Sequence, residues 1–133
     1  TIGVGERERS VAVIGIGVDL VDIDRFRRSL ERTPSMRRRL FTETELAYVE
    51  PQADPVPSLA ARFAAREAVM KSLGVGLGAF GFHEVWVDRA ASGQPSLVVT
   101  GRAAELADRA GVVTWHLSLT HSDLMAAAYV VAT

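Results

Sequence analysis

The sequence predicts an α+β fold in which an antiparallel sheet packs on a long central helix, and three observations support it. Strand-like and helical segments follow the order β-α-α-α-β-β-α-β-β, two pairs of neighbouring strands are separated by hairpin signals, and residues 58–73 form one uninterrupted helical stretch. A chain of 133 residues suits one domain. We expect this domain to cover residues 11–133, with residues 1–10 as an N-terminal extension or a remnant of cloning.

The first element is predicted over Val11–Val18, a β-branched run that is typical of a buried strand. Its two glycines indicate that another part of the backbone approaches it closely. Asp22 or Asp24 is suited to cap the helix that follows, in which Phe26 and Leu30 share one face.

The next helix has a clear start signal. Thr42 as N-cap and Glu45 three residues later form a capping box, and Phe41 is placed to pack on Leu46 as a hydrophobic staple. Prolines at 51, 55 and 57 end this helix and predict a loop before Ser58.

The longest helix is predicted to begin at Ser58 and to end before Gly74, which suits the C′ position. A glycine-rich turn follows at residues 74–81. The remaining predicted elements are a hairpin of strands at 84–88 and 96–100, a helix at 102–110 ended by Gly111, and strands at 113–120 and 126–131.

The composition argues against several protein classes. The longest apolar run, residues 11–18, is far shorter than the roughly 20 residues that span a bilayer. The polar residues 1–10 lead us to expect no secretory signal. The chain has no cysteine, which excludes disulfides, thiolate metal sites and a cysteine nucleophile. These features favour a cytoplasmic protein without a membrane partner.

The formal net charge of -1 conceals a strongly basic segment. Residues 25–39 hold seven arginines and one acidic residue, so this segment carries about +6. Such a segment is a solvated surface, a nucleic-acid site or a site for an acidic protein. The only aromatic residue in it is Phe26, which weakens the nucleic-acid interpretation.

The first candidate for chemistry is Asp19, at the end of the glycine-containing strand. A carboxylate beside glycines is suited to hold a cation near the backbone. Taken alone, an aspartate that caps the next turn is the commoner role.

The second candidate is the pair Glu67 and Lys71, which the spacing i, i+4 places on one face of the long helix. An exposed ion pair is the simplest interpretation. However, Lys71 is the only lysine in the chain and lies just before the glycine-rich turn, where a phosphate could be held. Arg62 and Arg66 add positive charge, and each taken alone is expected to be a solvated arginine.

The third candidate is the segment 115–122. Strand alternation places Trp115, Leu117 and Leu119 on one face and His116, Ser118 and Thr120 on the other. The hydroxyl-bearing face, ending at His121 and Ser122, is suited to bind phosphate oxygens. A zinc site is not expected, because the two histidines lie on opposite faces of the strand.

Three motifs together resemble the holo-[acyl-carrier-protein] synthase type of 4′-phosphopantetheinyl transferase: GIGVDLVDIDRF, RFAAREAVMKSLGVGLG and WHLSLTHSDLMAAAYVV. The resemblance covers residues 13–131. It implies Mg²⁺-dependent transfer of 4′-phosphopantetheine from coenzyme A (CoA) to a serine of apo acyl carrier protein, with release of adenosine 3′,5′-bisphosphate. It also implies a homotrimer with CoA sites at the subunit interfaces, and a role in fatty acid or related lipid biosynthesis.

The resemblance assigns roles to residues at matching positions. It implies that Asp19 and Glu67 hold the metal ion and that Lys71 contacts CoA phosphate. The further expected CoA contacts are Arg62, Gly74, Gly76 and His121. Arg25, with Arg28 and Arg32 beside it, is expected to dock the acidic carrier protein. The proton of the acceptor serine is expected to go either to Glu67 or to a metal-bound water near Asp19.

Two features depart from the family pattern. Arg66 stands where many members have lysine, and the loop from Pro51 to Pro57 has no counterpart from which contacts can be transferred. Two alternative functions remain open at this point. One is an arginine-rich nucleic-acid-binding module, and the other is a non-catalytic homotrimeric CoA-binding domain.

Overall fold

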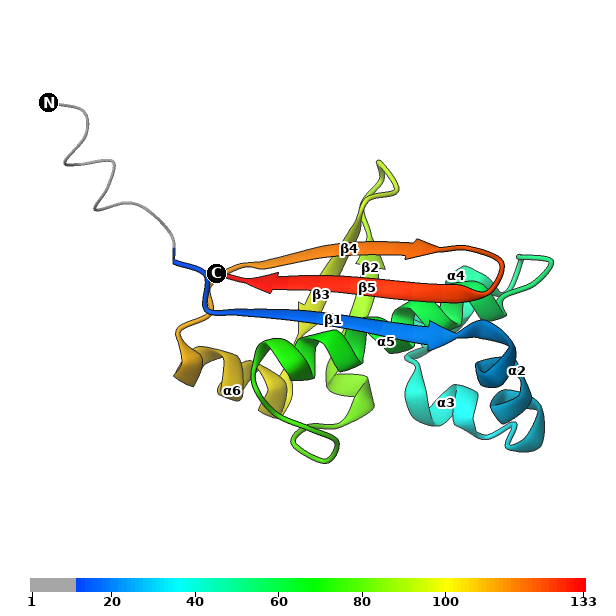
Figure 1. The fold of residues 1–133 in the computed structure, drawn as a ribbon, viewed down its shortest axis with the longest axis horizontal. Coiled ribbons are helices and arrows are strands. Elements are labelled where there is room, and N and C mark those ends of the chain that lie inside the picture. Colours follow the sequence, from blue (N-terminus) through cyan, green and yellow to red (C-terminus); the bar gives the residue numbers. More distant parts are fainter. Residues whose placement is uncertain (1–11) are drawn as a thin grey trace, which may run out of the picture.

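The computed structural model describes residues 12–133 and confirms the α+β fold (Figure 1). An antiparallel sheet has the strand order β1–β5–β4, and β2 and β3 form a separate antiparallel pair. The expected N-terminal extension, residues 1–10, lies outside the described residues. The elements are β1 (Gly15–Asp22), α2 (Ile23–Arg32), α3 (Met36–Leu40), α4 (Glu43–Val49), α5 (Val56–Ser72), η1 (Phe82–Glu84), β2 (Val85–Arg89), β3 (Pro95–Val99), α6 (Gly101–Ala110), β4 (Trp115–His121) and β5 (Met125–Ala132).

Helix α5 is the centre of the molecule. The three-stranded sheet covers one side of it (Figure 1), helices α2 to α4 pack around its first half, and β2, β3 and α6 pack around its second half. Five alanines of α5 are almost completely buried: Ala60, Ala61, Ala64, Ala65 and Ala68. Their small side chains let neighbouring elements approach the helix closely, so α5 has no solvated face along most of its length.

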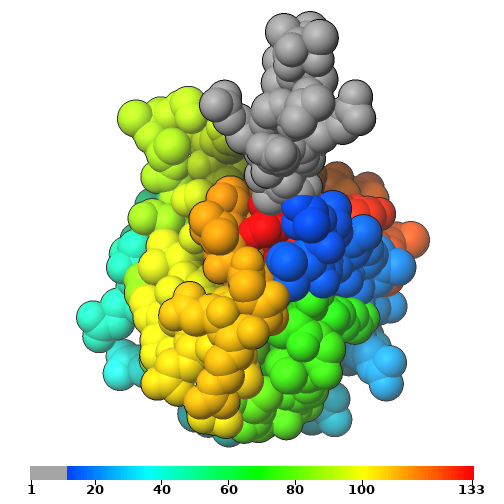
Figure 2. All heavy atoms as spheres, turned by 90° about the vertical axis from the view of Figure 1, so that its left-hand side faces the viewer, coloured from blue at the N-terminus to red at the C-terminus, as the bar shows by residue number. Residues whose placement is uncertain are grey.

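Strand β1 approaches the backbone of α5 more closely than any side chain would permit. A Cβ atom on Gly17 would lie 1.8 Å from the carbonyl oxygen of Ala68, and one on Gly15 would lie 1.8 Å from that of Ser72. Figure 2 shows β1 in blue against the green end of α5 and the turn after it. The predicted close backbone approach is confirmed, and it brings Asp19 next to α5.

The predicted limits and burial of the first strand were wrong. β1 begins at Gly15 and continues to Asp22, whereas Val11 lies outside the described residues. Only alternate residues face α5, and the others are open to solvent: Ile16 is 64% exposed and Leu20 is 62% exposed. The reason is that β1 is an edge strand in a sheet with one covered face, so apolar residues on its other face have no partner among residues 12–133.

Local signals placed the helix ends well. The Asp22 carboxylate accepts a hydrogen bond from the Arg25 amide at 2.9 Å and caps α2. The capping box of Thr42 and Glu45 is present at α4. Gly74 adopts a positive φ of 69° directly after α5, as expected for a C′ glycine.

The start of α5 differs from the prediction by two residues. The helix begins at Val56, so Pro57 lies in its first turn. Proline is accepted there because an amide in the first turn has no partner within the helix.

The second half of the chain follows the prediction with small shifts. Strands β2 and β3 are each displaced by one residue, α6 ends at Gly111 as expected, and β4 and β5 match to within two residues. The short helix η1 was not predicted. Its Glu84 carboxylate accepts hydrogen bonds from the amides of Gly81 and Arg102, which joins the end of the glycine-rich turn to the start of α6. Within residues 12–133, no helix is long and apolar enough to cross a membrane.

Candidate active site

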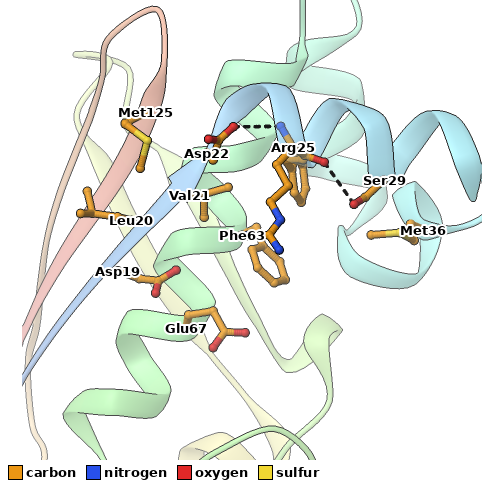
Figure 3. Close-up of a pocket in the computed structure, with 11 residues that line it drawn as sticks. Asp19, Leu20, Val21, Asp22, Arg25, Ser29, Met36, Phe63, Glu67 and Met125 are labelled. Atoms are coloured by element: carbon orange, nitrogen blue, oxygen red, sulfur yellow. Dashed lines mark hydrogen bonds between the residues drawn. The ribbon is translucent and has the colours of Figure 1, made fainter.

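A cleft of about 530 Å³ opens between β1, α2 and α5 (Figure 3). Its walls combine three carboxylates and one arginine with apolar side chains. The residues that line it are Asp19, Leu20, Val21, Asp22, Arg25, Phe26, Ser29, Met36, Phe63, Glu67 and Met125. Three residues predicted from the sequence, Asp19, Glu67 and Arg25, therefore meet in one cavity.

Asp19 and Glu67 enter the cleft from different elements. Asp19 comes from β1 and Glu67 from α5, and Figure 3 shows both carboxylates directed toward the same space. Burial raises the pKa of Glu67, the charge of Asp19 raises it further, and the charge of Lys71 partly opposes them. The folded chain therefore holds two acidic groups close enough for their charges to interact.

Lys71 reaches across from α5 to β1. Its ammonium group donates hydrogen bonds to Asp19 Oδ1 at 3.0 Å and to the carbonyl oxygen of Val18 at 2.9 Å. The spacing on the helix would also permit an ion pair with Glu67, but in residues 12–133 the only ion pair of Lys71 is with Asp19. The structure thus unites Asp19, Glu67 and Lys71.

Two other candidate residues lie just beyond this group. Gly74 and Gly76 follow the last turn of α5, in the turn after Lys71. A Cβ atom on either glycine would meet no other atom within 4 Å, so this stretch of backbone is open to an approaching molecule. Their assignment to phosphate binding stays a prediction.

Arg62 and His121 do not join the cleft within one chain. Arg62 is on the part of α5 that faces α4, where its guanidinium lies 4.8 Å from the ring centre of Tyr48. His121 is exposed at the end of β4, with Nδ1 3.4 Å from the carbonyl oxygen of Ser122. Neither lines the cavity that Asp19 and Glu67 share.

The expectation that Arg62 and Arg66 are solvated was wrong. Their exposed fractions are 2% and 0%, and burial lowers the pKa of Arg62. Arg66 forms a buried ion pair with Glu45 of α4. The physical reason is that α5 is enclosed on nearly all sides, so its arginines must find partners inside the protein.

The arginines of α2 are divided between two surfaces. Arg25, Arg28 and Arg32 are exposed on one side of the helix, and within residues 12–133 none of them forms an ion pair. Arg27, by contrast, makes a two-pronged ion pair with Asp54 at 2.9 and 2.8 Å. The three predicted docking arginines are thus free of partners in the described chain, and Arg25 connects them to the cleft.

The apolar part of the cleft was not predicted. Phe63, Met36 and Met125 line it together with Ser29. Phe63 lies four residues before Glu67, so helical spacing alone could have placed it on the same face. No comparable local signal connects Met36 or Met125 to Asp19, because they come from α3 and from the opposite end of the chain.

The donor set of the cleft fits a hard divalent cation. Asp19 and Glu67 face one space, where burial first and the charge of Asp19 second raise the pKa of Glu67. Within residues 12–133, no group of three or more acidic, histidine or cysteine side chains is arranged to hold a metal. Mg²⁺ commonly binds through one or two carboxylates, with water and substrate phosphates completing its shell.

Comparison with known proteins agrees with this geometry. Residues 15–133 match the model of the 4′-phosphopantetheinyl transferase superfamily. The chain is 50% identical over 123 residues to the holo-[acyl-carrier-protein] synthase of Streptomyces avermitilis, covering 92% of this chain and 98% of that protein.

Solved structures share the fold. The holo-[acyl-carrier-protein] synthase of Neisseria meningitidis superposes with a TM-score of 0.83 at 30% identity, covering 92% of this chain and 99% of that one. The synthase of Bacillus anthracis, solved in complex with CoA (3′,5′-ADP), superposes with a TM-score of 0.76 at 28% identity, covering 92% and 97%. This chain belongs to the 4′-phosphopantetheinyl transferase superfamily and, within it, to the holo-[acyl-carrier-protein] synthases.

Proposed function

We propose that the protein transfers 4′-phosphopantetheine from CoA to a serine hydroxyl of an apo acyl carrier protein, in a Mg²⁺-dependent reaction that releases adenosine 3′,5′-bisphosphate. The observation that carries this proposal is that Asp19 and Glu67 line one cleft and that Lys71 forms an ion pair with Asp19. CoA-bound relatives of the same fold support CoA as the substrate. We further propose that the enzyme is cytoplasmic and acts in the biosynthesis of fatty acids or related lipids.

The residues of the cleft suit phosphoryl transfer, which depends on positioning and charge neutralisation. Asp19 and Glu67 would hold Mg²⁺, which when bound neutralises negative charge on a diphosphate. Lys71 would bind a phosphate oxygen of CoA and stabilise charge on the leaving group. The open backbone at Gly74 and Gly76 would let the phosphates approach beside Lys71.

The acceptor serine must lose its proton to a base within reach. Burial and the nearby Asp19 raise the pKa of Glu67 in the metal-free chain, and a cation held by both carboxylates would lower it again. The proposed base is therefore either Glu67 or a water near Asp19. The apolar side chains of Phe63 and Met125 would exclude bulk water from this proton transfer.

The arginine face of α2 would dock the carrier protein. Arg25, Arg28 and Arg32 are exposed and have no acidic partner in the described chain. Because Arg25 also lines the cleft, a carrier bound on this face would present its serine next to Glu67. Carrier proteins are acidic, so this charge would also steer their approach.

The uncovered face of the sheet supports assembly with further copies of the chain. Ile16, Val18 and Leu20 of β1 point away from α5, and the register places Val18 opposite Tyr129 of β5. Exposed apolar side chains on a regular sheet face are typical of an interface. We therefore propose that this face is buried in a homotrimer.

The same assembly would explain the position of Arg62 and His121. Both lie away from the cleft of their own chain, and the Nε atom of Arg62 is buried without a hydrogen-bond partner in residues 12–133. In a trimer with shared sites, the exposed His121 of one copy would contact CoA phosphates held by Asp19, Glu67 and Lys71 of the next. Arg62 is only 2% exposed, so a CoA contact would require its side chain to move outward. His116, Ser118 and Thr120 on the outward face of β4 would lie near that interface.

Mass spectrometry tests the function directly. The protein is incubated with an apo carrier protein, CoA and Mg²⁺, and we expect the carrier to gain one phosphopantetheine group. A metal chelator should stop the reaction, as should Asp19→Ala or Glu67→Ala in a variant shown by circular dichroism to be folded. Full activity of either folded variant would refute the metal assignment, and an unmodified carrier with wild-type protein across several carriers would refute the transfer.

A further inference from the structure

A buried ion pair lies beside the cleft, on a different side of α5 from Glu67. The Arg66 guanidinium donates to both carboxylate oxygens of Glu45, at 2.9 and 2.5 Å, and both side chains are completely buried. Arg66 also donates from Nε to the carbonyl oxygen of Phe82 at 2.8 Å. Its guanidinium lies 5.2 Å from the ring centre of Phe41.

Glu45 extends this pair into a network. Its carboxylate accepts hydrogen bonds from the backbone amides of Thr42 at 3.0 Å and Val87 at 3.1 Å. Through Glu45 and Arg66, four elements are joined at one point of α5: α4, α5, η1 and β2. Arginine suits this place because its Nε and its two Nη atoms are separate nitrogens, which donate to the Phe82 carbonyl and to both oxygens of Glu45 at the same time.

The position of Arg66 in the sequence connects this network to the candidate active site. Arg66 is the neighbour of Glu67, and the two side chains leave α5 on different sides: Glu67 into the cleft and Arg66 into the core. On the β1 side, Gly17 touches the backbone of α5 at Ala68. The helix is therefore held between β1 and the Glu45–Arg66 pair within a single turn that contains Glu67.

A buried ion pair is a costly way to stabilise a core. The desolvation of two charges offsets most of their attraction, and apolar residues of similar volume often serve as well. The specific value of such a pair is geometric, since its hydrogen bonds are satisfied in only one arrangement of the elements.

From these contacts we propose that Glu45 and Arg66 are positioning residues: they set the rotation of α5 about its axis, so that the Glu67 carboxylate faces Asp19 across the cleft. The pair contacts no substrate and acts through Glu67. This inference rests on the proposed function for its catalytic consequence, but its structural consequence can be measured without any reaction.

Two variants test the proposal without leaving an unpaired buried charge. Arg66→Lys keeps the positive charge but loses the two separate Nη groups that donate to the two oxygens of Glu45. The double variant Glu45→Gln with Arg66→Met removes both charges. Its single glutamine oxygen can accept a hydrogen bond from the amide of Thr42 or from that of Val87 but not from both, because these amides bind different oxygens of Glu45. Val49→Ala is the matched control, because Val49 is a buried residue of the same helix α4 that takes no part in the network.

Crystal structures and kinetics of each folded variant give separate answers. In the double variant we expect the Glu67 carboxylate to move away from Asp19, kcat to fall at least tenfold, and KM for the carrier protein to stay within twofold. Arg66→Lys introduces the residue that many family members have at this position, so it should displace Glu67 less and lower kcat less. Val49→Ala should lose stability while Glu67 keeps its place and kcat stays within twofold.

Two results would overturn the positioning role: an unmoved Glu67 in the double variant, or a loss of kcat that Val49→Ala reproduces at equal stability. A failure of the proposed function would give a different result from a failure of the positioning role. In that case wild-type protein would not modify any carrier, while the crystal structures would still show whether Glu67 depends on Arg66.

Discussion

The ammonium group of Lys71 lies 3.0 Å from Asp19 Oδ1 and neutralises the carboxylate that is predicted to hold a metal ion. The same ammonium is predicted to bind a CoA phosphate, and it cannot do both with full strength. Lys71 is therefore a counterion of Asp19 in this structure, and under the proposed function the substrate phosphates would compete with Asp19 for it. This relationship connects metal binding to CoA binding.

Replacing Lys71 should strengthen metal binding in the absence of CoA. In Lys71→Met, Asp19 loses its competing cation, and we expect Mn²⁺ or Mg²⁺ to bind about two- to fivefold more tightly, the range for a partly exposed ion pair. Transfer activity should nevertheless fall, because a phosphate contact is lost. Metal affinity is measured by calorimetry or by Mn²⁺ electron paramagnetic resonance.

Arg25→Met is the control for Lys71→Met. It removes a cation that lines the same cleft but is not paired with Asp19. A smaller increase in metal affinity is expected for it. Equal increases in the two variants would mean that general charge, rather than the Lys71–Asp19 contact, sets the affinity.

Glu67→Gln should stabilise the metal-free protein at neutral pH. Burial and Asp19 raise the pKa of Glu67 in the folded chain, so the folded state holds this proton more tightly than the unfolded state. The stabilisation from that proton is present below the unfolded pKa and is lost as the pH rises through the folded pKa. At pH 7, the wild type therefore carries an unfavourable charge that glutamine removes.

Urea denaturation in the presence of a chelator measures this effect. The free energy of unfolding of Glu67→Gln should exceed that of wild type at pH 7, and the difference should shrink as the pH falls through the folded pKa of Glu67. Asp123→Asn, at an exposed residue of the β4–β5 turn, should show no such pattern. A difference that grows on acidification would contradict the sign of the pKa shift.

Gly17→Ala should damage the contact between β1 and α5. The added Cβ atom would lie 1.8 Å from the carbonyl oxygen of Ala68, and neither backbone can yield without moving a whole element. We expect a loss of about 1–3 kcal/mol or more in the free energy of unfolding. Gly76→Ala is the control, since a Cβ atom there meets nothing within 4 Å. Similar stabilities of the two variants would show that β1 adjusts freely.

Arg28→Glu should impair carrier binding while leaving CoA binding intact. Arg28 is exposed on α2 and does not line the cleft, so its charge can act on the carrier without touching the reacting groups. We expect KM for the carrier to rise severalfold, KM for CoA to change less than twofold, and the difference to shrink at high salt. Arg109→Glu on α6 is the charge-matched control. Equal increases in both KM values would exclude α2 as the docking surface.

The features that could be predicted from sequence are those decided by neighbours along the chain. Thr42 and Glu45 lie three residues apart, and Gly74 follows its helix directly, so each carries its own signal. The motif residues Asp19 and Glu67 were identified by family resemblance, and the structure shows that they share a cleft.

The features that were missed depend on contacts between distant residues. Arg66 looks like any helical arginine, and its burial follows from Glu45, which is 21 residues away in the chain. Likewise, the spacing of Lys71 suggests Glu67 as its partner, but the close approach of β1 offers Asp19, 52 residues away. Local periodicity contains no information about which distant residue forms the ion pair.

Mixing of inactive subunits tests whether the active site is shared between copies. Asp19→Ala lacks a predicted metal ligand, and His121→Ala lacks a predicted CoA contact that lies outside the cleft of its own chain. If the two residues act from neighbouring copies, a mixed trimer contains some sites in which both are intact. For equal amounts and random assembly, about one quarter of the sites would be complete, because each of the two copies at a site has a one-half chance of supplying its intact residue.

The mixed sample should therefore reach about one quarter of wild-type activity after co-expression or refolding together, when each variant alone is nearly inactive. Asp19→Ala mixed with Glu67→Ala is the control, since both residues line the cleft of one chain and no mixed site would be complete. Activity equal to the mean of the two parents in the first mixture would place Asp19 and His121 at the same site of a single copy, and would remove the argument for a shared site.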